Sequence, residues 1–183
     1  MAVTYCAYIL ANPGDVLHKN YHDQEYGFPL DSDAALLERL ALEINQAGLS
    51  WTTILKKKEA FHAAFEGFDP RRVAGYVSDD VARLMADASI IRNRRKIEAV
   101  IENARRVVKL GESHGSFAAW LDANHPRSRE EWVKLFKQVF VFTGGEIVNE
   151  FLISTGYLPG AHEPGCPVYA RVLALRPAWN RRT

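Results

Sequence analysis

Cysteine is nearly absent from this chain: only Cys6 and Cys166 occur among 183 residues. This scarcity excludes the small, disulfide-rich class of secreted scaffolds. One disulfide is possible, but His22 and His162 stand near the two cysteines in sequence. Cysteine paired with histidine in a chain of this size favours a metal site or free thiols over a disulfide.

Long apolar runs are also absent. No stretch of about 18 apolar residues occurs, which argues against a membrane-spanning helix. The opening residues, Met-Ala-Val-Thr-Tyr-Cys, lack the basic and apolar regions of a secretory signal. We therefore expect a cytoplasmic protein with no membrane partner. No linker, repeat or low-complexity stretch divides the chain, so we predict a single domain over residues 1–183.

Alternating strand-like patterns are nearly missing, and this predicts an all-α fold. Helix start and stop residues are frequent: Ser50, Ser116 and Ser128 are typical N-caps, and Asp69-Pro70 has the form of an N-cap followed by proline. We expect Gly111 to end the longest helix. The predicted helices cover about 32–47, 51–65, a short segment from 69, 78–87, 93–110, segments after 116 and 128, 145–155 and a short segment after 167.

The net charge of +1 does not indicate a nucleic-acid partner. Basic residues nevertheless gather in three places, which are 56–58, 105–109 and the run Arg92, Arg94, Arg95 and Lys96. Such groups are most often solvated helix faces. The alternative is a surface that contacts phosphates.

The two cysteines and two histidines have the composition of a Cys2His2 metal site. If Cys6, His22, His162 and Cys166 meet in space, four ligands close a tetrahedral site and leave no open position for water. We therefore expect a structural Zn²⁺ ion that joins the N- and C-terminal segments.

Glu43 interrupts an apolar helix face. In the 32–47 helix it shares one face with Leu36, Leu40 and Ala47. A carboxylate in such a stripe is costly unless it is paired or used. It is either a rim residue that reaches water, or an acceptor for a cationic or hydrogen-donating ligand.

The segment 45–51 predicts a tight joint between two helices. Gly48 permits a positive φ angle, and Leu49 and Trp51 follow it. Both apolar residues could belong to the core. Alternatively, Leu49 inserts into a base stack and Trp51 supplies a stacking face.

The segment 78–97 resembles a hairpin of two helices, with Ile90-Ile91 packed in the turn and basic residues after it. The first backbone N–H groups of the second helix would form an anion site, around which the arginines and Lys96 would contact a phosphate backbone.

Several boxes together resemble one enzyme family. These are residues 21–27 (YHDQEYG), 43–57 (EINQAGLSWTTILKK), 68–70 (FDP), 90–93 (IIRN) and the pair His162 and Cys166. They follow the order found in the 3-methyladenine DNA glycosylase I family of the helix-hairpin-helix superfamily. The resemblance covers about residues 5–169.

The resemblance implies two helical lobes, with zinc held by Cys6, His22, His162 and Cys166. It also implies a monofunctional enzyme that flips 3-methyladenine out of double-stranded DNA, hydrolyses its N-glycosidic bond and leaves an abasic site. An N3-alkylated adenine is cationic and leaves readily, so extrusion and selection of the base are the main tasks. We expect the enzyme to be a monomer.

The resemblance also assigns the site. Glu43, Tyr21 and Trp51 form the catalytic set: Glu43 accepts hydrogen bonds from the base, Tyr21 lines the pocket and Trp51 stacks on the base. Leu49, after Gly48, fills the gap in the duplex. Some positions depart from the family pattern but still fall on the expected site or hairpin, namely Tyr8, His18, Tyr26, Ser89, Glu146 and Asn149.

Tyr8, His18 and Tyr26 are expected to bind the base. Glu146 and Asn149 either reach the pocket or cap and solvate the helix that follows Gly144-Gly145. Two other functions remain open, a non-catalytic binder of alkylation damage and a zinc-stabilised helical interaction module.

Overall fold

The computed structural model describes residues 4–181, and all regular elements in this range are helical. The all-α prediction is therefore confirmed. The elements are α1 (Tyr5–Ala11), α2 (Val16–Gln24), α3 (Asp33–Gln46), α4 (Trp51–Ala64), η1 (Glu66–Phe68), α5 (Pro70–Ala74), α6 (Ser78–Ala86), α7 (Arg94–His114), α8 (Phe117–Asn124), α9 (Arg129–Val139), α10 (Gly145–Ser154), α11 (Pro167–Ala174) and η2 (Ala178–Asn180).

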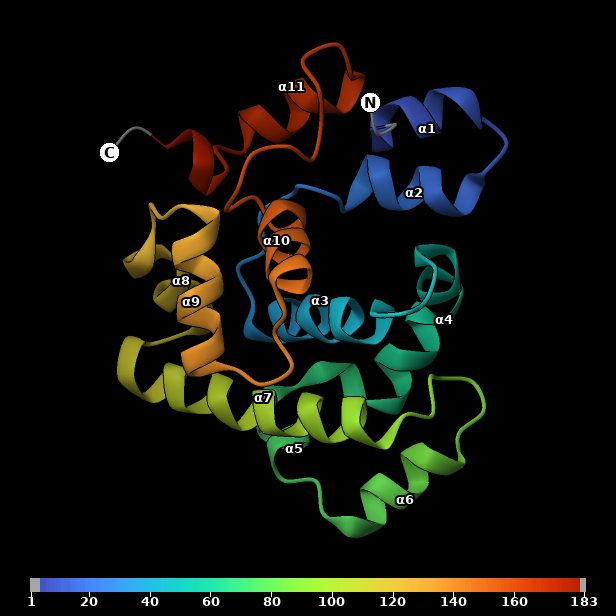
Figure 1. Cartoon of the computed structure of the whole chain (residues 1–183), viewed down its shortest axis with the longest axis vertical. Helices are drawn as coiled ribbons and strands as arrows, with labels where there is room; N and C mark the ends of the chain where they lie inside the picture. Colours follow the sequence, from blue (N-terminus) through green and yellow to red (C-terminus); the bar gives the residue numbers. More distant parts are fainter. Residues whose placement is uncertain (1–3, 182–183) are drawn as a thin grey trace.

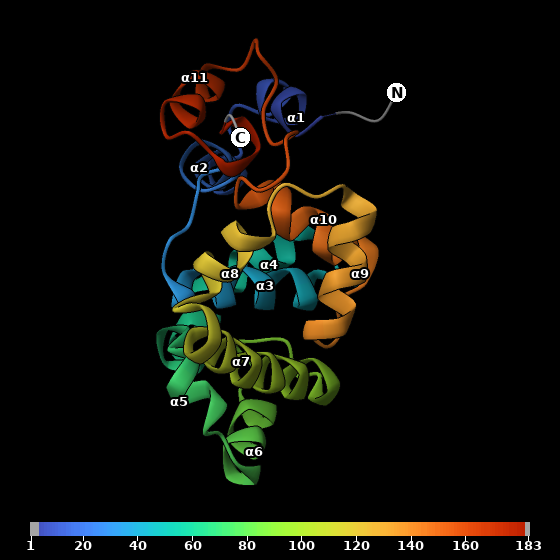
Figure 2. The same ribbon diagram turned by 90° about the vertical axis from the view of Figure 1, so that its left-hand side faces the viewer.

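Helix α3 lies at the centre of the larger body. It packs against α4, α7, α8 and α10, and these helices surround it in both views (Figures 1 and 2). Its side chains from Leu36 to Asn45 are almost all buried, including the charged Arg39 and Glu43. A helix buried on most of its surface can carry polar groups only where partners or a ligand meet them.

The first and last helices form a second, smaller group. Helices α1, α2 and α11 lie together at one end of the molecule, although α11 is far from the other two in sequence (Figure 1). Cys6, Cys166, Val168 and Val172 form a small apolar cluster there, separate from the main core. Segments near the two ends of the chain thus meet, as the cysteine and histidine positions predicted.

Most predicted caps are confirmed. The side chains of Ser50, Ser116 and Ser128 accept hydrogen bonds from backbone N–H groups, as N-caps do. The predicted end at Gly111 is wrong: α7 continues through it to His114, and Gly115 ends the helix with φ 89°. A glycine inside a helix costs only about 1 kcal/mol, which the buried face of α7 offsets.

Helices α1 and α2 were not predicted. Each is short, and each begins at a polar cap, Thr4 and Asp15 respectively. No helix within residues 4–181 is both long and apolar enough to cross a membrane.

Candidate active site

A pocket opens between α1, α2, α3, α4 and α10. Its cavity volume is about 440 Å³, which lies in the range of small-molecule sites. The lining contains all six residues expected to bind a base: Tyr8, His18, Tyr21, Tyr26, Glu43 and Trp51. Residues from distant parts of the sequence thus meet in one concave, largely aromatic site.

Glu43 projects into this pocket from α3. It is 5% exposed, so the rim interpretation is wrong. Burial raises the pKa of its carboxyl group to about 8, the neighbouring Arg39 lowers it and Glu150 raises it. No hydrogen bond in the described range goes to the Glu43 carboxyl group. A buried carboxyl group without a partner inside a pocket is an acceptor available to a ligand.

Tyr21 and Trp51 form an aromatic corner beside Glu43. Their rings are 5.1 Å apart between centroids and inclined by 61°. The Tyr21 hydroxyl is buried and has no hydrogen-bond partner among residues 4–181. Arg39 packs over the Tyr21 ring, with its guanidinium carbon 5.1 Å from the ring centroid. The corner offers aromatic faces to the pocket, while the hydroxyl behind them stays without a partner.

Arg39 is itself held in place. Nη1 donates to the Ser154 carbonyl oxygen at 3.2 Å and Nη2 to Glu25 Oε2 at 3.4 Å. Its charge therefore lies near Glu43 but is shared with Glu25, so Glu43 is not neutralised by a direct ion pair.

His18 joins three walls of the pocket. Its Nε2 lies 2.8 Å from Thr52 Oγ1 on α4, and its Nδ1 lies 2.9 Å from the Tyr5 hydroxyl on α1. Tyr8 donates to Asp15 at 2.7 Å, at the start of α2. These bonds fix the short helices α1 and α2 against the body, and they orient the aromatic rings that a flat ligand would meet.

The turn between α3 and α4 lies at the pocket rim. Gly48 has φ 81°, the left-handed conformation that its position predicted. Leu49 is 38% exposed, so it is not a core residue. Gln46, which lines the pocket, donates from Nε2 to the Leu49 carbonyl oxygen at 3.0 Å. The exposed leucine is thus fixed beside the cavity.

The arginines of the 92–96 run face solvent. Arg92, Arg94 and Arg95 are all exposed at the start of α7. Arg94 forms a loose pair with Glu98 at 3.6 Å, which contributes little at an exposed site. All three side chains are accessible to an anionic partner.

Lys96 differs from the expectation that it belongs to that exposed group. It is 6% exposed, and its Nζ donates to the carbonyl oxygens of Asn45 at 2.8 Å and Ala47 at 2.7 Å. Burial lowers the pKa of its ammonium group. Because the last carbonyls of a helix lack intrahelical partners, a cation there is favourable. Lys96 therefore holds the α3–α4 turn against α7, and its ammonium is turned away from the surface.

The hairpin turn itself is also fixed from α4. Ile90 is buried in the turn as predicted, and Lys57 donates to the carbonyl oxygens of Ala88 and Ser89 at 3.2 and 2.8 Å. Ser89 donates to Asp87 and does not adopt a positive φ angle. The serine is thus accommodated without backbone strain.

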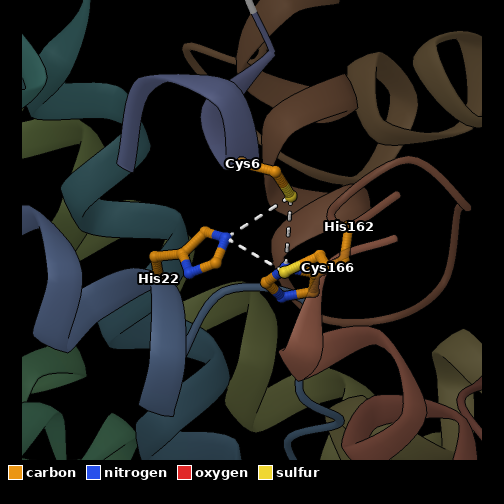
Figure 3. Close-up of side chains that lie close together, drawn as sticks. All are labelled: Cys6, His22, His162 and Cys166. Carbon is orange, nitrogen blue, oxygen red and sulfur yellow. Dashed lines mark hydrogen bonds between the residues drawn. The ribbon is translucent and has the colours of Figure 1, made fainter. Parts of the chain in front are cut away.

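The four predicted metal ligands meet in a buried cluster. One ligand atom from each of Cys6, His22, His162 and Cys166 lies within 4.8 Å of every other (Figure 3). The sulfur-to-nitrogen distances are 3.4 Å for Cys6–His22 and 3.7 Å for Cys6–His162, Cys166–His22 and Cys166–His162. This group could hold a metal ion.

The geometry fits a tetrahedral ion. Metal–sulfur and metal–nitrogen bonds of the usual zinc lengths, at the tetrahedral angle, separate sulfur from nitrogen by about 3.6 Å. The outer ring nitrogens are fixed too: His22 Nδ1 lies 2.7 Å from Asp23 Oδ1, and His162 Nε2 lies 2.7 Å from the Tyr26 carbonyl oxygen. Such outer partners orient ligating histidines.

Several pocket residues were missed by sequence reasoning. Thr4, Tyr5, Gln46 and Glu150 also line the cavity. Two residues of α10, Glu146 and Asn149, depart from the family pattern. Glu146 is exposed and pairs with Arg129 at 2.5 Å, which agrees with a solvated helix start. Neither Glu146 nor Asn149 lines the pocket, and the α10 carboxyl group that does is Glu150.

The fold and the site together define an all-helical protein with an acidic, aromatic pocket that takes a flat ligand, and a Cys2His2 cluster that joins its ends. Comparison with known proteins identifies the family within this class. Residues 11–140 match the family model described as methyladenine glycosylase.

Two curated proteins are similar over most of their length. DNA-3-methyladenine glycosylase 1 of Escherichia coli K12 is 37% identical, over 90% of this chain and 96% of its own. DNA-3-methyladenine glycosylase of Haemophilus influenzae is 35% identical, over 82% of this chain and 91% of its own.

Solved structures agree. The 3-methyladenine DNA glycosylase I of Staphylococcus aureus has a TM-score of 0.79 and 36% identity, covering 92% of this chain and 97% of its own. A tyrosine-to-phenylalanine variant of a 3-methyladenine DNA glycosylase I, in complex with 3-methyladenine, has a TM-score of 0.77 and 36% identity, covering 84% and 92%. This chain belongs to the methyladenine glycosylase family.

Proposed function

We propose that this chain is a monofunctional DNA glycosylase that removes 3-methyladenine from alkylated double-stranded DNA and leaves an abasic site. The observation that carries the proposal is the pocket in which Glu43, Tyr21 and Trp51 meet. Its volume suits a single flipped purine. Relatives that share more than a third of their aligned residues with this chain carry this activity in their names.

The reaction needs selection more than it needs a strong general base. In N3-alkylated adenine the purine already carries a positive charge, so the bond from its N9 to C1′ of the sugar is weak. Cleavage leaves the bonding electrons on the base, and water adds to C1′ and releases a proton. Glu43 accepts hydrogen bonds from the base, Trp51 and Tyr21 stack on it, and their faces attract its cationic charge.

The exposed turn supplies the wedge. Leu49 stands beside the pocket entrance and fills the place of the flipped nucleotide. The hairpin formed by α6, the turn at 87–93 and α7 resembles a helix-hairpin-helix element, and Arg92, Arg94 and Arg95 contact the phosphates around it. Lys96 acts differently from our first expectation, because it positions the wedge turn from inside.

The Cys2His2 cluster holds a structural Zn²⁺ ion. Two thiolates, two imidazoles and fixed outer nitrogens are the arrangement that closed zinc sites use. When bound, the ion ties α1 and α2 to the segment before α11. This joint supports our prediction of one domain over 1–183. A monomeric state and a cytoplasmic location stay predictions.

The decisive experiment measures bases released from methylated duplex DNA, separated by identity. Free 3-methyladenine and abasic sites should appear in equal amounts. DNA binding without release would favour a non-catalytic damage binder. Absence of DNA binding at low salt would favour the interaction module.

The DNA surface is tested by salt dependence. Each phosphate contact removed should lower the slope of log affinity against log salt by roughly one unit. Replacing Arg92, Arg94 and Arg95 by alanine should weaken binding to damaged and undamaged duplex equally. Affinity for free 3-methyladenine should not change, and a selective loss for damaged DNA would contradict this assignment.

A further inference from the structure

The pocket contains a second carboxyl group that the family resemblance did not indicate. Glu150 lines the cavity together with Glu43, but it comes from another helix, α10, near the opposite end of the sequence. Its position is held by two weak donors: the Tyr26 hydroxyl donates to Oε2 at 3.3 Å, and Asn149 Nδ2 donates to Oε1 at 3.4 Å.

Neither pocket carboxyl group has a hydrogen-bonded cation within residues 4–181. Arg129 is the cation near Glu150, but Glu146 binds it at 2.5 Å. Arg39 is the cation near Glu43, but it donates to Ser154 and Glu25. Burial raises the pKa of both carboxyl groups, and the charge of Glu150 raises that of Glu43 further. One buried acid, Glu43, and one half-buried acid, Glu150, without a hydrogen-bonded cation create a site that a positive ligand completes.

We propose, on the basis of the function proposed above, that Glu150 is a specificity-determining residue that makes the pocket favour cationic N-alkylpurines over neutral purines. The ligand class is an alkylated purine still joined to its sugar, in which the ring carries the positive charge. Glu43 selects by hydrogen bonds at the edge of the base, while Glu150 selects by charge.

This selection distinguishes substrate from product. Before the reaction the purine is a cation. When the N9–C1′ bond breaks, the bonding electrons remain on the purine and neutralise it, while the water oxygen bonds to C1′ and its proton leaves. Glu150 therefore attracts the bound nucleotide and loses that attraction once the base is free, which favours release of the product.

The test compares two small probes at pH 8 by calorimetry on the full chain. The cation is 3,9-dimethyladeninium, whose second methyl group stands in for the sugar. The neutral probe is 3-methyladenine. The measured quantity is the ratio of the dissociation constant of the neutral probe to that of the cation.

In Glu150→Gln this ratio should fall roughly tenfold, because a single charge is lost from a partly buried site. Affinity for neutral 3-methyladenine should change less than about twofold. Glu146→Gln is the matched control: it removes the same charge one turn earlier on α10, from a side chain that is 85% exposed. Its ratio should equal that of the unmodified protein.

An unchanged ratio of dissociation constants in Glu150→Gln would overturn the proposal. An equal fall in Glu146→Gln would overturn it too, because the effect would then come from the net charge of the protein and not from a contact in the pocket. Glu150→Ser provides a second measurement if the glutamine variant yields little folded protein. Failure of the proposed function has a different outcome, in which the unmodified protein binds neither probe and releases no methylated base.

Discussion

Two places in this protein bury polar side chains. In one of them the polar groups have hydrogen-bond partners, and in the other they do not. In the Cys2His2 cluster each histidine uses both ring nitrogens, one toward the sulfurs and one toward Asp23 or the Tyr26 carbonyl. In the base pocket the Tyr21 hydroxyl has no hydrogen-bond partner among the described residues. The Glu43 carboxyl group likewise accepts no hydrogen bond from them. A satisfied cluster stabilises the fold, whereas an unsatisfied pocket is complete only with its ligand.

The largest expected effect comes from breaking the satisfied cluster. Cys166→Ser should lower the melting temperature by about 10 °C, which is roughly 3 kcal/mol for a chain of this size. Metal analysis should show less bound zinc, and the protein that remains folded should still bind 3-methyladenine. Glu163→Gln, at an exposed position in the same loop, is the control. If Cys166→Ser lost base binding but kept its melting temperature, the cluster would serve the pocket and not the stability of the fold.

Glu43→Gln should have opposite effects on binding and on stability. Removing the acceptor should weaken 3-methyladenine binding by about 1–3 kcal/mol. The pKa of Glu43 rises from 4.5 to about 8 in the folded protein, so the folded state holds more protons than the unfolded chain between these values. Stability therefore falls as pH rises through this window, and the variant should not show that fall.

The measurement for Glu43→Gln is the melting temperature at pH 5 and pH 8. The variant and the unmodified protein should have similar melting temperatures at pH 5. At pH 8 the variant should have the higher melting temperature. If the difference in melting temperature did not depend on pH, the Glu43 carboxyl group would already have a partner in the free protein.

The buried Lys96 and the exposed Arg94 lie within one turn of α7, so substitutions there compare a structural basic residue with a surface one. Lys96→Met should cost about 1–2 kcal/mol in unfolding free energy, because two carbonyls lose a charged donor. It should also slow excision from duplex DNA, since the α3–α4 turn that carries the proposed wedge residue, Leu49, loses its support. Arg94→Ala should leave stability within about 0.5 kcal/mol and weaken DNA binding only. Chemical denaturation beside a duplex excision assay separates the two.

Leu49→Ala should have the smallest effect on stability, within about 0.5 kcal/mol, because its side chain is already exposed. Excision from duplex DNA should slow while affinity for free 3-methyladenine is retained. A loss of about 2–5 kcal/mol in stability would instead identify Leu49 as a core residue.

Sequence patterns predicted the parts of the molecule that local rules control. The caps of α4, α8 and α9 and the turn at Gly48 all depend on residues within one or two turns of chain. Helices α1 and α2 were missed because they are short and depend on contacts with other parts of the chain, such as those of α2 with α4. Local propensity alone does not stabilise helices of this length.

Sequence reasoning predicted six of the residues that line the pocket and missed four, while the roles assigned to them stay predictions. The resemblance boxes brought together Tyr21, Glu43 and Trp51, but they carried no signal for Glu150, whose direction depends on how α10 packs against α3. Lys96 was grouped with its arginine neighbours because they are adjacent in sequence. Helical rotation turns it inward, and only the packing of α7 on α3 shows which carbonyls receive it.

Tyr26 belongs to both sites at once. Its carbonyl oxygen accepts the His162 bond, its hydroxyl reaches Glu150, and the next residue, Gly27, has φ 82° and leaves no room for a side chain against Ala161. One peptide therefore connects the cluster directly to the pocket wall. Thermodynamic linkage then requires reciprocity: if metal occupancy tightens purine binding by some factor, a bound purine tightens metal binding by the same factor. The segment that joins the two ends of the fold is thus also part of the wall of the pocket.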